Sequence, residues 1–362
     1  MFFYLFSIVI SLFLAEVWSK RELNVYKINY INYPDFTCRT YTKTREYIYI
    51  LLIASLPIFT MAVRYMVGTD YAGTYTIDFN LIKNGYRTRN EFLSYLMYKF
   101  AAFLSDDVQA YFIITSILCV FLTYIGIYKL SVKPIYSIVL YFVTYQYFTS
   151  MNGVRQMVAT AIVIVALPFL FRSRYKIFVL FVIIAGLVHY AAFVYLIFMP
   201  LYFLKMDFKK SVFALCLMAI LLPLLKTPIH TLIEYTPYGH YLMRNTEFGV
   251  STLFILINVI VYIVMGFVSR NNKKYQFWMK IQMLIILIGL IQSIIPLAGR
   301  VMAFFSFFRM IIIPEISVNI KNSKMRFLFD LCIVGFYCMY CIYGMMYANW
   351  DDVLPYQTIF SR

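Results

Sequence analysis

The feature that most constrains this chain is a series of apolar runs, each near the length that crosses a lipid bilayer. A membrane-spanning helix needs about 17–25 mostly apolar residues, and runs of roughly that size recur along the whole chain. Hydrophobic residues make up 63% of the 362 residues and charged residues 13%, whereas about a quarter of an ordinary soluble chain is charged. This composition excludes a water-soluble globular enzyme, a disordered protein and a secreted disulfide scaffold.

The runs predict an all-α fold, a polytopic integral membrane helical bundle with about twelve transmembrane helices that forms a single domain over residues 1–362. The predicted spans are approximately 2–18, 47–66, 107–128, 134–149, 153–171, 175–189, 190–204, 211–225, 250–269, 280–296, 301–317 and 327–348. The first span is expected to be retained, because it has neither a basic start nor a small-residue cleavage site.

The net charge of +16 comes from 32 Lys and Arg against 16 Asp and Glu. In a soluble protein such an excess would suggest nucleic acid as a partner. Here most basic residues fall in loops that share one side if the chain crosses at every predicted span, and basic loops stay in the cytoplasm. We therefore expect a multi-pass membrane protein with no nucleic acid partner and both termini outside. This topology requires a helical hairpin that breaks near His189–Tyr190.

Two outward-facing segments are long on this topology. The first, 67–106, includes an apolar stretch at 91–104 that is too short to span and is expected to lie at the interface or to re-enter. The second, 226–249, contains Pro228, Pro237 and Gly239 as helix breakers.

The sequence contains no motif for nucleotide or metal chemistry. It has no Gly-rich phosphate loop, no dinucleotide fingerprint and no Asp-x-Asp pair. Its three histidines, His189, His230 and His240, are not at metal-ligand spacing. Cys338 and Cys341 are interpreted as small apolar residues of a membrane helix. We therefore expect no metal site and no cofactor.

Ionisable residues at or within predicted spans are candidates for function, because lipid makes charge costly. Arg64, Arg155, His189 and Arg300 all fall near the outer ends of their spans. Snorkelling could account for Arg64 or Arg300 singly, but four such residues at one depth favour a reaction site. Arg309 lies mid-span, about half a turn out of phase with Arg300, and is expected to pair with Glu315 or another buried acid.

The segment that begins at Asn152 predicts an anion site. Asn152, Arg155, Gln156 and Ala159 follow the spacing i, i+3, i+4 and i+7, which puts them on one face at a helix N-terminus. A guanidinium, two amides and the positive end of a helix dipole favour phosphate or pyrophosphate there. The alternative is an ordinary polar helix start.

The first outward segment supplies further polar candidates. Gly68-Thr69-Asp70-Tyr71 combines a turn residue, a carboxylate and an aromatic ring, and Tyr71 and Tyr75 could stack on sugars. Asp70 could instead form a structural pair with Arg64, and Glu91 could simply cap the helix that follows it.

Taken in order, these motifs resemble the EpsG-type, Wzy-like family of bacterial polysaccharide polymerases. The resemblance rests on Gly68-Thr69-Asp70-Tyr71, Glu91, the 152–159 segment, His189-Tyr190-Ala191-Ala192, Arg300 before Ala303-Phe-Phe-Ser-Phe-Phe, and Leu354-Pro355-Tyr356. The pattern of some other Wzy-type polymerases, two Arg-containing outward loops ending in Gly, is not evident.

The resemblance implies a glycosyltransferase of the bacterial inner (cytoplasmic) membrane that joins repeat units of O-antigen, capsule or exopolysaccharide at the outer face. Donor and acceptor would be glycans carried on undecaprenyl pyrophosphate, so the leaving group supplies the energy and no nucleotide is needed. The resemblance also allows a chain-length regulator protein as a partner, besides the lipid bilayer.

For this reaction we expect Arg155 and Arg300 to clamp the pyrophosphate and His189 or Asp70 to deprotonate the acceptor hydroxyl. Glu91 is a weaker candidate base. Further substrate contacts are expected from Arg64, Tyr71, Tyr75, Glu91, Asn152, Gln156 and Arg309.

Three other functions remain open. An O-antigen ligase-like enzyme would share the lipid-linked donor. A flippase for lipid-linked oligosaccharides would line a path through the membrane with cations, whereas the charges here lie mostly at the outer depth. A membrane acyltransferase usually pairs its His with a nearby acid, and His189 has no such neighbour in sequence.

Overall fold

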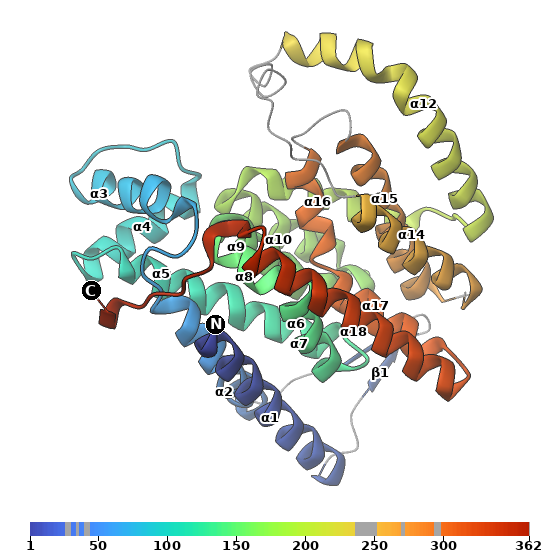
Figure 1. The fold of residues 1–362 in the computed structure, drawn as a ribbon, viewed down its shortest axis with the longest axis horizontal. Coiled ribbons are helices and arrows are strands. Elements are labelled where there is room, and N and C mark those ends of the chain that lie inside the picture. The colour runs from blue at the N-terminus through green and yellow to red at the C-terminus, as the bar shows by residue number, and fades with distance from the viewer. Residues whose placement is uncertain are drawn as a thin grey trace. The chain divides into compact units, whose positions relative to one another are not determined.

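The computed structural model describes residues 1–25, 30–33, 36–39, 44–235, 252–268, 272–292 and 298–361. In this part the chain is mostly helical (Figure 1), apart from an antiparallel hairpin of β1 (Tyr30–Tyr33) and β2 (Phe36–Arg39). The all-α prediction missed this hairpin, because strands of four residues in a basic loop leave little periodic signal.

The chain divides into two compact units. Unit 1 comprises residues 1–196 and 322–362, and unit 2 comprises residues 197–321. This division does not test the predicted single membrane domain over 1–362, which stays a prediction.

The helices of unit 1 are α1 (Phe2–Val25), α2 (Thr44–Ala62), η1 (Tyr71–Thr76), α3 (Ile77–Lys83), α4 (Phe92–Leu104), α5 (Gln109–Ser116), η2 (Ile117–Phe121), α6 (Leu122–Leu130), α7 (Pro134–Val143), α8 (Gln146–Asn152), α9 (Val154–Phe171), α10 (Tyr175–Val188), η3 (Tyr190–Ile197, which ends at the boundary), α18 (Ser323–Met346), η4 (Trp350–Asp352) and η5 (Ile359–Ser361). Unit 2 contains α11 (Phe198–Phe203), α12 (Phe208–Glu234), α14 (Thr252–Phe267), α15 (Lys273–Gln292), α16 (Ala298–Ser306) and α17 (Arg309–Asn319).

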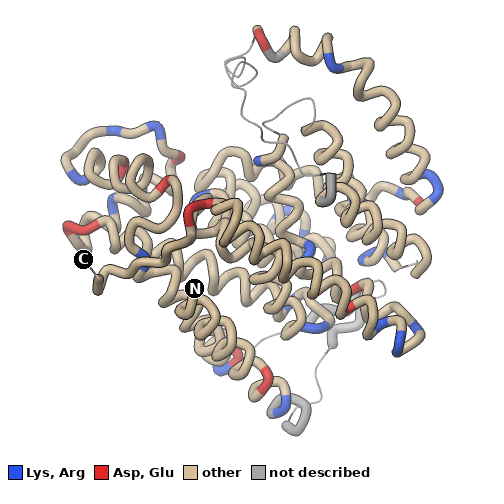
Figure 2. The backbone as a smooth tube through the Cα atoms, viewed as in Figure 1, with Lys and Arg blue, Asp and Glu red and all other residues tan. Residues whose placement is uncertain are grey.

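Seven helices in the described part of the chain are long and apolar enough to cross a membrane, and the bent pair α16–α17 would make an eighth. The seven are α1, α2, the continuous α5–α6, α9, α12, α15 and α18. The four remaining predicted spans coincide with shorter apolar helices of 10–17 residues, namely α7, α10, η3–α11 and α14. Figure 2 shows charged residues mostly near helix ends. A polytopic helical membrane protein is thus supported, whereas twelve crossings are not confirmed.

One predicted span is shorter because its helix is interrupted. The run 134–149 was expected to be continuous, but α7 ends at Val143 and α8 begins at Gln146. Between them Tyr145 has a left-handed backbone, with φ +71°. Apolar composition gave no sign of this turn, since a buried turn is as apolar as the helices it joins.

The two long outward segments differ in how far they match the prediction. The first contains η1, α3 and α4, and α4 covers the predicted stretch 91–104 almost exactly to its ends. In the second, α12 continues to Glu234 despite Pro223 and Pro228, so the part of 226–249 up to Glu234 is helix rather than loop. Residues 236–249 of that predicted segment lie outside the described residues.

Helix α9 forms the buried centre of unit 1, packed by α10, α6, η2 and α8. Gly126 of α6 permits a close approach, because a Cβ there would lie 2.6 Å from the Ile164 side chain of α9. A helix that is buried on all sides is apolar on all sides. The polar residues at its start, Arg155 and Gln156, therefore stand out as the exception.

The predicted break at His189 is confirmed, whereas the two crossings of the hairpin stay a prediction. α10 ends at Val188, His189 is extended with φ −154° and ψ 113°, and a 3₁₀ helix begins at Tyr190. Gly186 allows the Phe193 ring to fold back on α10, because a Cβ there would lie 2.5 Å from that ring. The break places the His189 side chain at the end of α10, where α10 contacts α4.

Candidate functional site

The carboxylate of Glu91 joins two of the predicted site residues. Its Oε2 accepts a hydrogen bond from Arg155 Nη1 at 2.9 Å, and its Oε1 lies 2.9 Å from His189 Nδ1. The main-chain N–H of Tyr190 also donates to Oε1, at 3.3 Å. The Glu91 side chain is 8% exposed, whereas those of Arg155 and His189 are 23% and 27% exposed. Three groups distant in sequence thus form one cluster whose guanidinium and imidazole are partly exposed.

Each member of this cluster stands where a helix begins or ends. Glu91 is the N-cap residue of α4 and has an extended backbone. Arg155 lies in the first turn of α9, and His189 follows the last residue of α10. Helix ends leave the chain free to turn, so their side chains can converge without burying a helix face. We call Glu91, Arg155 and His189 the Glu91 cluster.

The surroundings of the Glu91 carboxyl favour its ionised form. Burial alone would raise the pKa of the Glu91 carboxyl, but the hydrogen bond with His189, that from its own main-chain amide and the charge of Arg155 outweigh burial and lower the pKa to about 2. A carboxyl with so low a pKa is a poor proton acceptor at neutral pH. It can instead hold the proton of the imidazole on Nδ1, which leaves the lone pair on Nε2.

The guanidinium of Arg155 is held from one side only. Its Nη1 donates to Glu91 Oε2 and to Asn90 Oδ1. Asn90 is in turn fixed by donating to Asp78 Oδ2 at 2.9 Å and Thr88 Oγ1 at 2.8 Å. Nε and Nη2 of Arg155 make no hydrogen bond within the described residues. These donors fit the two oxygens of a phosphoryl group.

Asn152 departs from its predicted place on the helix face. α8 ends at Asn152, Gly153 follows, and α9 begins at Val154, so Asn152 and Arg155 belong to different helices. The Asn152 side chain is used inside the protein: Oδ1 accepts from Thr69 Oγ1 at 2.8 Å and from the Asp70 N–H at 3.0 Å, and Nδ2 donates to Asp351 Oδ1 at 2.8 Å. This geometry favours a supporting role over direct contact with substrate.

The structure explains why the Gly68-Thr69-Asp70-Tyr71 motif begins with glycine. Gly68 has φ +105°, and a Cβ there would lie 3.1 Å from Met151 O. The turn therefore packs against the end of α8 and places Thr69 and Asp70 beside Asn152. The Asp70 side chain is half-buried and has no hydrogen bond or ion pair within the described residues, so it stays a candidate base.

The tyrosines of the same segment lie inside the protein. Tyr71 is 4% exposed and stacks on Phe112 with 4.6 Å between ring centroids. Tyr75 is 3% exposed, and its hydroxyl donates to Asn152 O at 2.6 Å. Their rings are occupied by protein contacts, which favours a structural role over the predicted stacking on sugars.

Arg64 is fully buried beside the turn. Its Nη1 donates to Met61 O at 2.5 Å and its Nη2 to Met151 O at 3.2 Å, while the guanidinium lies 4.3 Å from the Phe112 ring centroid. The alternative pair with Asp70 is not among these contacts. Arg64 thus links the end of α2 to the end of α8, which places it behind the site rather than in contact with a substrate.

Gln156 lies beside Arg155 and is partly exposed, whereas Ala159 is completely buried. Position 156 is therefore accessible from outside the protein. Position 159 faces the protein interior, because α9 is the central helix of unit 1.

Arg300 and Arg309 belong to unit 2. Arg300 is exposed in the first turn of α16. Arg309 is buried: Nε donates to Asn258 Oδ1 at 3.2 Å, Nη2 donates to Ser306 Oγ at 3.0 Å, and the guanidinium lies 4.1 Å from the Phe254 ring centroid. The acid predicted for it, Glu315, pairs with Lys274 at 2.8 Å. Arg309 therefore has a place in the packing of unit 2.

The pairing of His189 with an acid was missed by the sequence analysis. Glu91 and His189 are 98 residues apart, and no periodicity links them. The one available signal was that both residues stand at helix ends assigned to the same depth. An acyltransferase is disfavoured by the sequence alone, because His189 has no acid near it in sequence. Glu91 supplies that acid in the structure, so this reason no longer counts against an acyltransferase.

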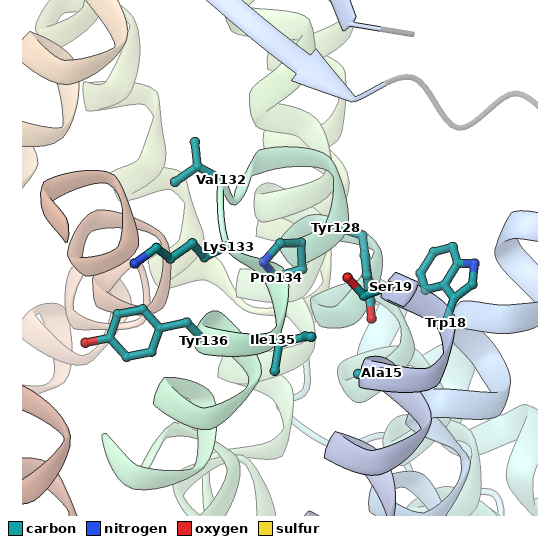
Figure 3. A pocket seen from close by; sticks show the side chains of 9 residues that line it. All are labelled: Ala15, Trp18, Ser19, Tyr128, Val132, Lys133, Pro134, Ile135 and Tyr136. Carbon is teal, nitrogen blue, oxygen red and sulfur yellow. The ribbon is translucent and has the colours of Figure 1, made fainter. Parts of the chain in front are cut away.

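A cavity of about 440 Å³ lies between α1 and the turn from α6 to α7. Figure 3 shows Lys133 and Tyr136 on one side of it and Trp18 and Tyr128 on the other. The cavity lies at the α6 end of the continuous helix α5–α6, whereas α4, which begins after Glu91, contacts α5 at the other end. The 22 residues of α5–α6 extend about 30 Å. No predicted site residue lines this cavity.

The comparison with protein-family models matches residues 46–358 to the EpsG family. The matched range contains the whole Glu91 cluster, Asn152, Arg300 and the polar turn at 68–71. The comparisons with curated proteins and with solved structures each gave no match. Because the family match spans most of the chain and the structure carries several apolar helices of membrane-spanning length, the chain belongs to the EpsG family and is a membrane protein of polysaccharide biosynthesis.

Proposed function

We propose that this protein polymerises a polysaccharide by joining repeat units carried on undecaprenyl pyrophosphate, at the outer face of the bacterial inner membrane. The observation that carries the proposal is the Glu91 cluster. It combines an imidazole held by an ionised carboxylate with a guanidinium whose outer donors have no acceptor within the described residues. Such a pair suits proton removal beside an anionic leaving group.

In the proposed reaction, His189 Nε2 takes the proton from a hydroxyl of the acceptor glycan. The hydroxyl oxygen forms a bond to the anomeric carbon of the donor glycan, and the bond from that carbon to the pyrophosphate oxygen breaks. The electron pair leaves with undecaprenyl pyrophosphate, whose charge Arg155 Nε and Nη2 stabilise. Glu91 stabilises the imidazolium that forms.

His189 is favoured over Asp70 as the base. The His189 ring is oriented by the hydrogen bond to Glu91, whereas the Asp70 carboxylate has no group in the described residues that orients it. Arg300, which is exposed in unit 2, stays a prediction from the sequence for the second member of the clamp. An Asp70→Asn variant that abolishes polymer while His189→Ala does not would reverse the assignment of the base.

The experiment is a gel of surface polysaccharide and of lipid-linked glycan from cells with and without the gene. A polymerase predicts that deletion leaves single repeat units on their carrier at the outer face and removes the ladder. A ligase-like enzyme predicts polymer retained on undecaprenyl pyrophosphate. A flippase predicts repeat units trapped on the cytoplasmic face. Either of the last two outcomes would overturn the proposal.

A further inference from the structure

The last residues of the chain pack against the polar turn that begins at Gly68. Three main-chain hydrogen bonds hold them together. Tyr65 N donates to Gln357 O at 2.9 Å, Ile359 N donates to Val63 O at 2.9 Å and Gly68 N donates to Asp352 O at 3.1 Å. We call residues 349–359 the C-terminal clasp. Figure 1 shows this segment leaving the end of α18 and continuing away from that helix to the end marked C, and η4 within it contacts α8.

The side chain of Asp351 connects the clasp to the start of α9. Asp351 Oδ1 accepts from Asn152 Nδ2 at 2.8 Å, which fixes the orientation of the amide. Because Nδ2 faces Asp351, Oδ1 faces the other way and accepts from Thr69 Oγ1 and the Asp70 N–H. One amide therefore ties three segments together, and only one orientation of it satisfies all of these partners.

Asn152 is also connected to the first turn of α9, through Tyr75. The Tyr75 hydroxyl donates to Asn152 O at 2.6 Å and accepts from Val154 N at 3.0 Å. Arg155 is the next residue after Val154. A shift of Asn152 would therefore move the main chain that carries the Arg155 guanidinium, and small displacements of a catalytic group cost rate steeply.

The backbone around Asp351 is held in an unusual conformation. Asn349, Asp351 and Asp352 have φ values of 44°, 60° and 46°, a region that non-glycine residues avoid and that persists where surrounding contacts impose it. Burial raises the pKa of the Asp351 carboxyl, the hydrogen bond from Asn152 opposes this, and the neighbouring Asp70 and Asp352 raise it further. The clasp thus places Asp351 against Asn152 at a conformational cost.

We propose that Asp351 is a positioning residue of the polymerase: through Asn152 it sets the place of the α9 start and so of Arg155. This inference rests on the proposed function, because Arg155 is its target. It also assigns the C-terminal clasp to the site, although the clasp is about 200 residues from Arg155 in sequence.

The test exchanges the two partners. Asn152→Asp alone puts two carboxylates face to face and is expected to lower the rate of polymer formation at least tenfold. Asn152→Asp combined with Asp351→Asn restores the pair with donor and acceptor reversed, because the new carboxylate can still accept from Thr69 and Asp70. We expect the double variant to recover activity to within about threefold of the native protein. Asp106→Asn, which makes the same change of side chain at a position outside the clasp whose side chain is 90% exposed, is the matched control and should change the rate less than twofold.

Each variant is expressed in cells that lack the gene, at equal membrane amounts, and polymer formed per hour is measured on gels. A double variant no more active than Asn152→Asp would overturn the positioning role, as would native activity in Asn152→Asp. Arg155→Ala is measured in parallel. If Arg155→Ala is inactive and the exchange fails, only the positioning role is lost. If Arg155→Ala is fully active, the proposed function itself is contradicted, whatever the exchange shows.

Discussion

The Glu91 carboxylate and the His189 imidazole lie 2.9 Å apart although 98 residues separate them in the chain. The contact joins the start of α4 to the end of α10, and the same carboxylate binds Arg155 at the start of α9. An imidazole, the carboxylate that orients it and a neighbouring guanidinium are therefore assembled from three helix ends. The following predictions test what each of them does.

Glu91→Gln should lower polymer formation about 100-fold or more. The amide keeps the size of the side chain but lacks the charge that holds the Nδ1 proton and stabilises the imidazolium. The measurement is polymer formed per hour at equal membrane amounts of protein. Asp106→Asn is the control, because the Asp106 side chain is 90% exposed and surface ion pairs contribute little. Native activity in Glu91→Gln would refute an orienting role for Glu91.

Arg155→Ala should lower the rate about 100- to 1,000-fold, the usual cost of removing one donor to a developing negative charge. Arg155→Lys should retain more activity than the alanine variant but stay well below the native rate, since an ammonium lacks the planar fork of a guanidinium. Arg87→Ala, which changes an exposed arginine, serves as the control. If lysine supports the native rate, the paired donors of Arg155 are not what the reaction uses.

The stability of the protein should fall in acid through Glu91. Its folded-state pKa of about 2 lies below the ordinary value of 4.5, so its ionised contacts stabilise the fold fully above about pH 4.5. That stabilisation, on the order of 3 kcal/mol, is lost as the pH falls from about 4.5 towards 2. Thermal unfolding in detergent between pH 2.5 and 7 measures it. Glu91→Gln should show a flatter dependence over this range, and an unchanged profile would disprove the assignment.

Gly68→Ala should destabilise unit 1 by about 1–2 kcal/mol and also reduce activity. Gly68 has a positive φ, and an added Cβ would press on Met151 O, so the turn would have to retreat from α8. Gly73→Ala provides the control, because a Cβ at Gly73 meets nothing within 4 Å. Thermal unfolding and polymer formation are measured on both variants. Equal effects of the two substitutions would show that the close approach at Gly68 is unimportant.

The parts of the fold that the sequence predicts well are those set by local composition. Long apolar runs located α1, α2 and α9, and the break at His189 followed from the need to keep basic loops on one side. The short turn at Tyr145 was missed, and the one at Gly153 lies at the predicted boundary between the spans 134–149 and 153–171. Both lie between apolar segments, and their conformation is imposed by packing rather than by a local signal.

The candidate site divides in the same way. Arg155 and His189 could be found because charge within apolar runs is conspicuous. Glu91 was named without its partners, and Asp351 was not assigned a role. Their hydrogen bonds join residues that are 98 positions apart in one case and 199 in the other, and such contacts leave no periodic pattern. Tyr71 and Tyr75 were interpreted from their chemistry alone, whereas their burial depends on α5 packing over them.

The most direct test of the proposed reaction is the length of the glycan on the lipid carrier in cells whose only copy of the gene encodes His189→Ala. The variant must be present in the membrane at the native amount. The account predicts that single repeat units accumulate on undecaprenyl pyrophosphate at the outer face and that the polymer ladder is lost. A ladder of native length and amount would contradict the assignment of His189 as the base and of the Glu91 cluster as the reaction site.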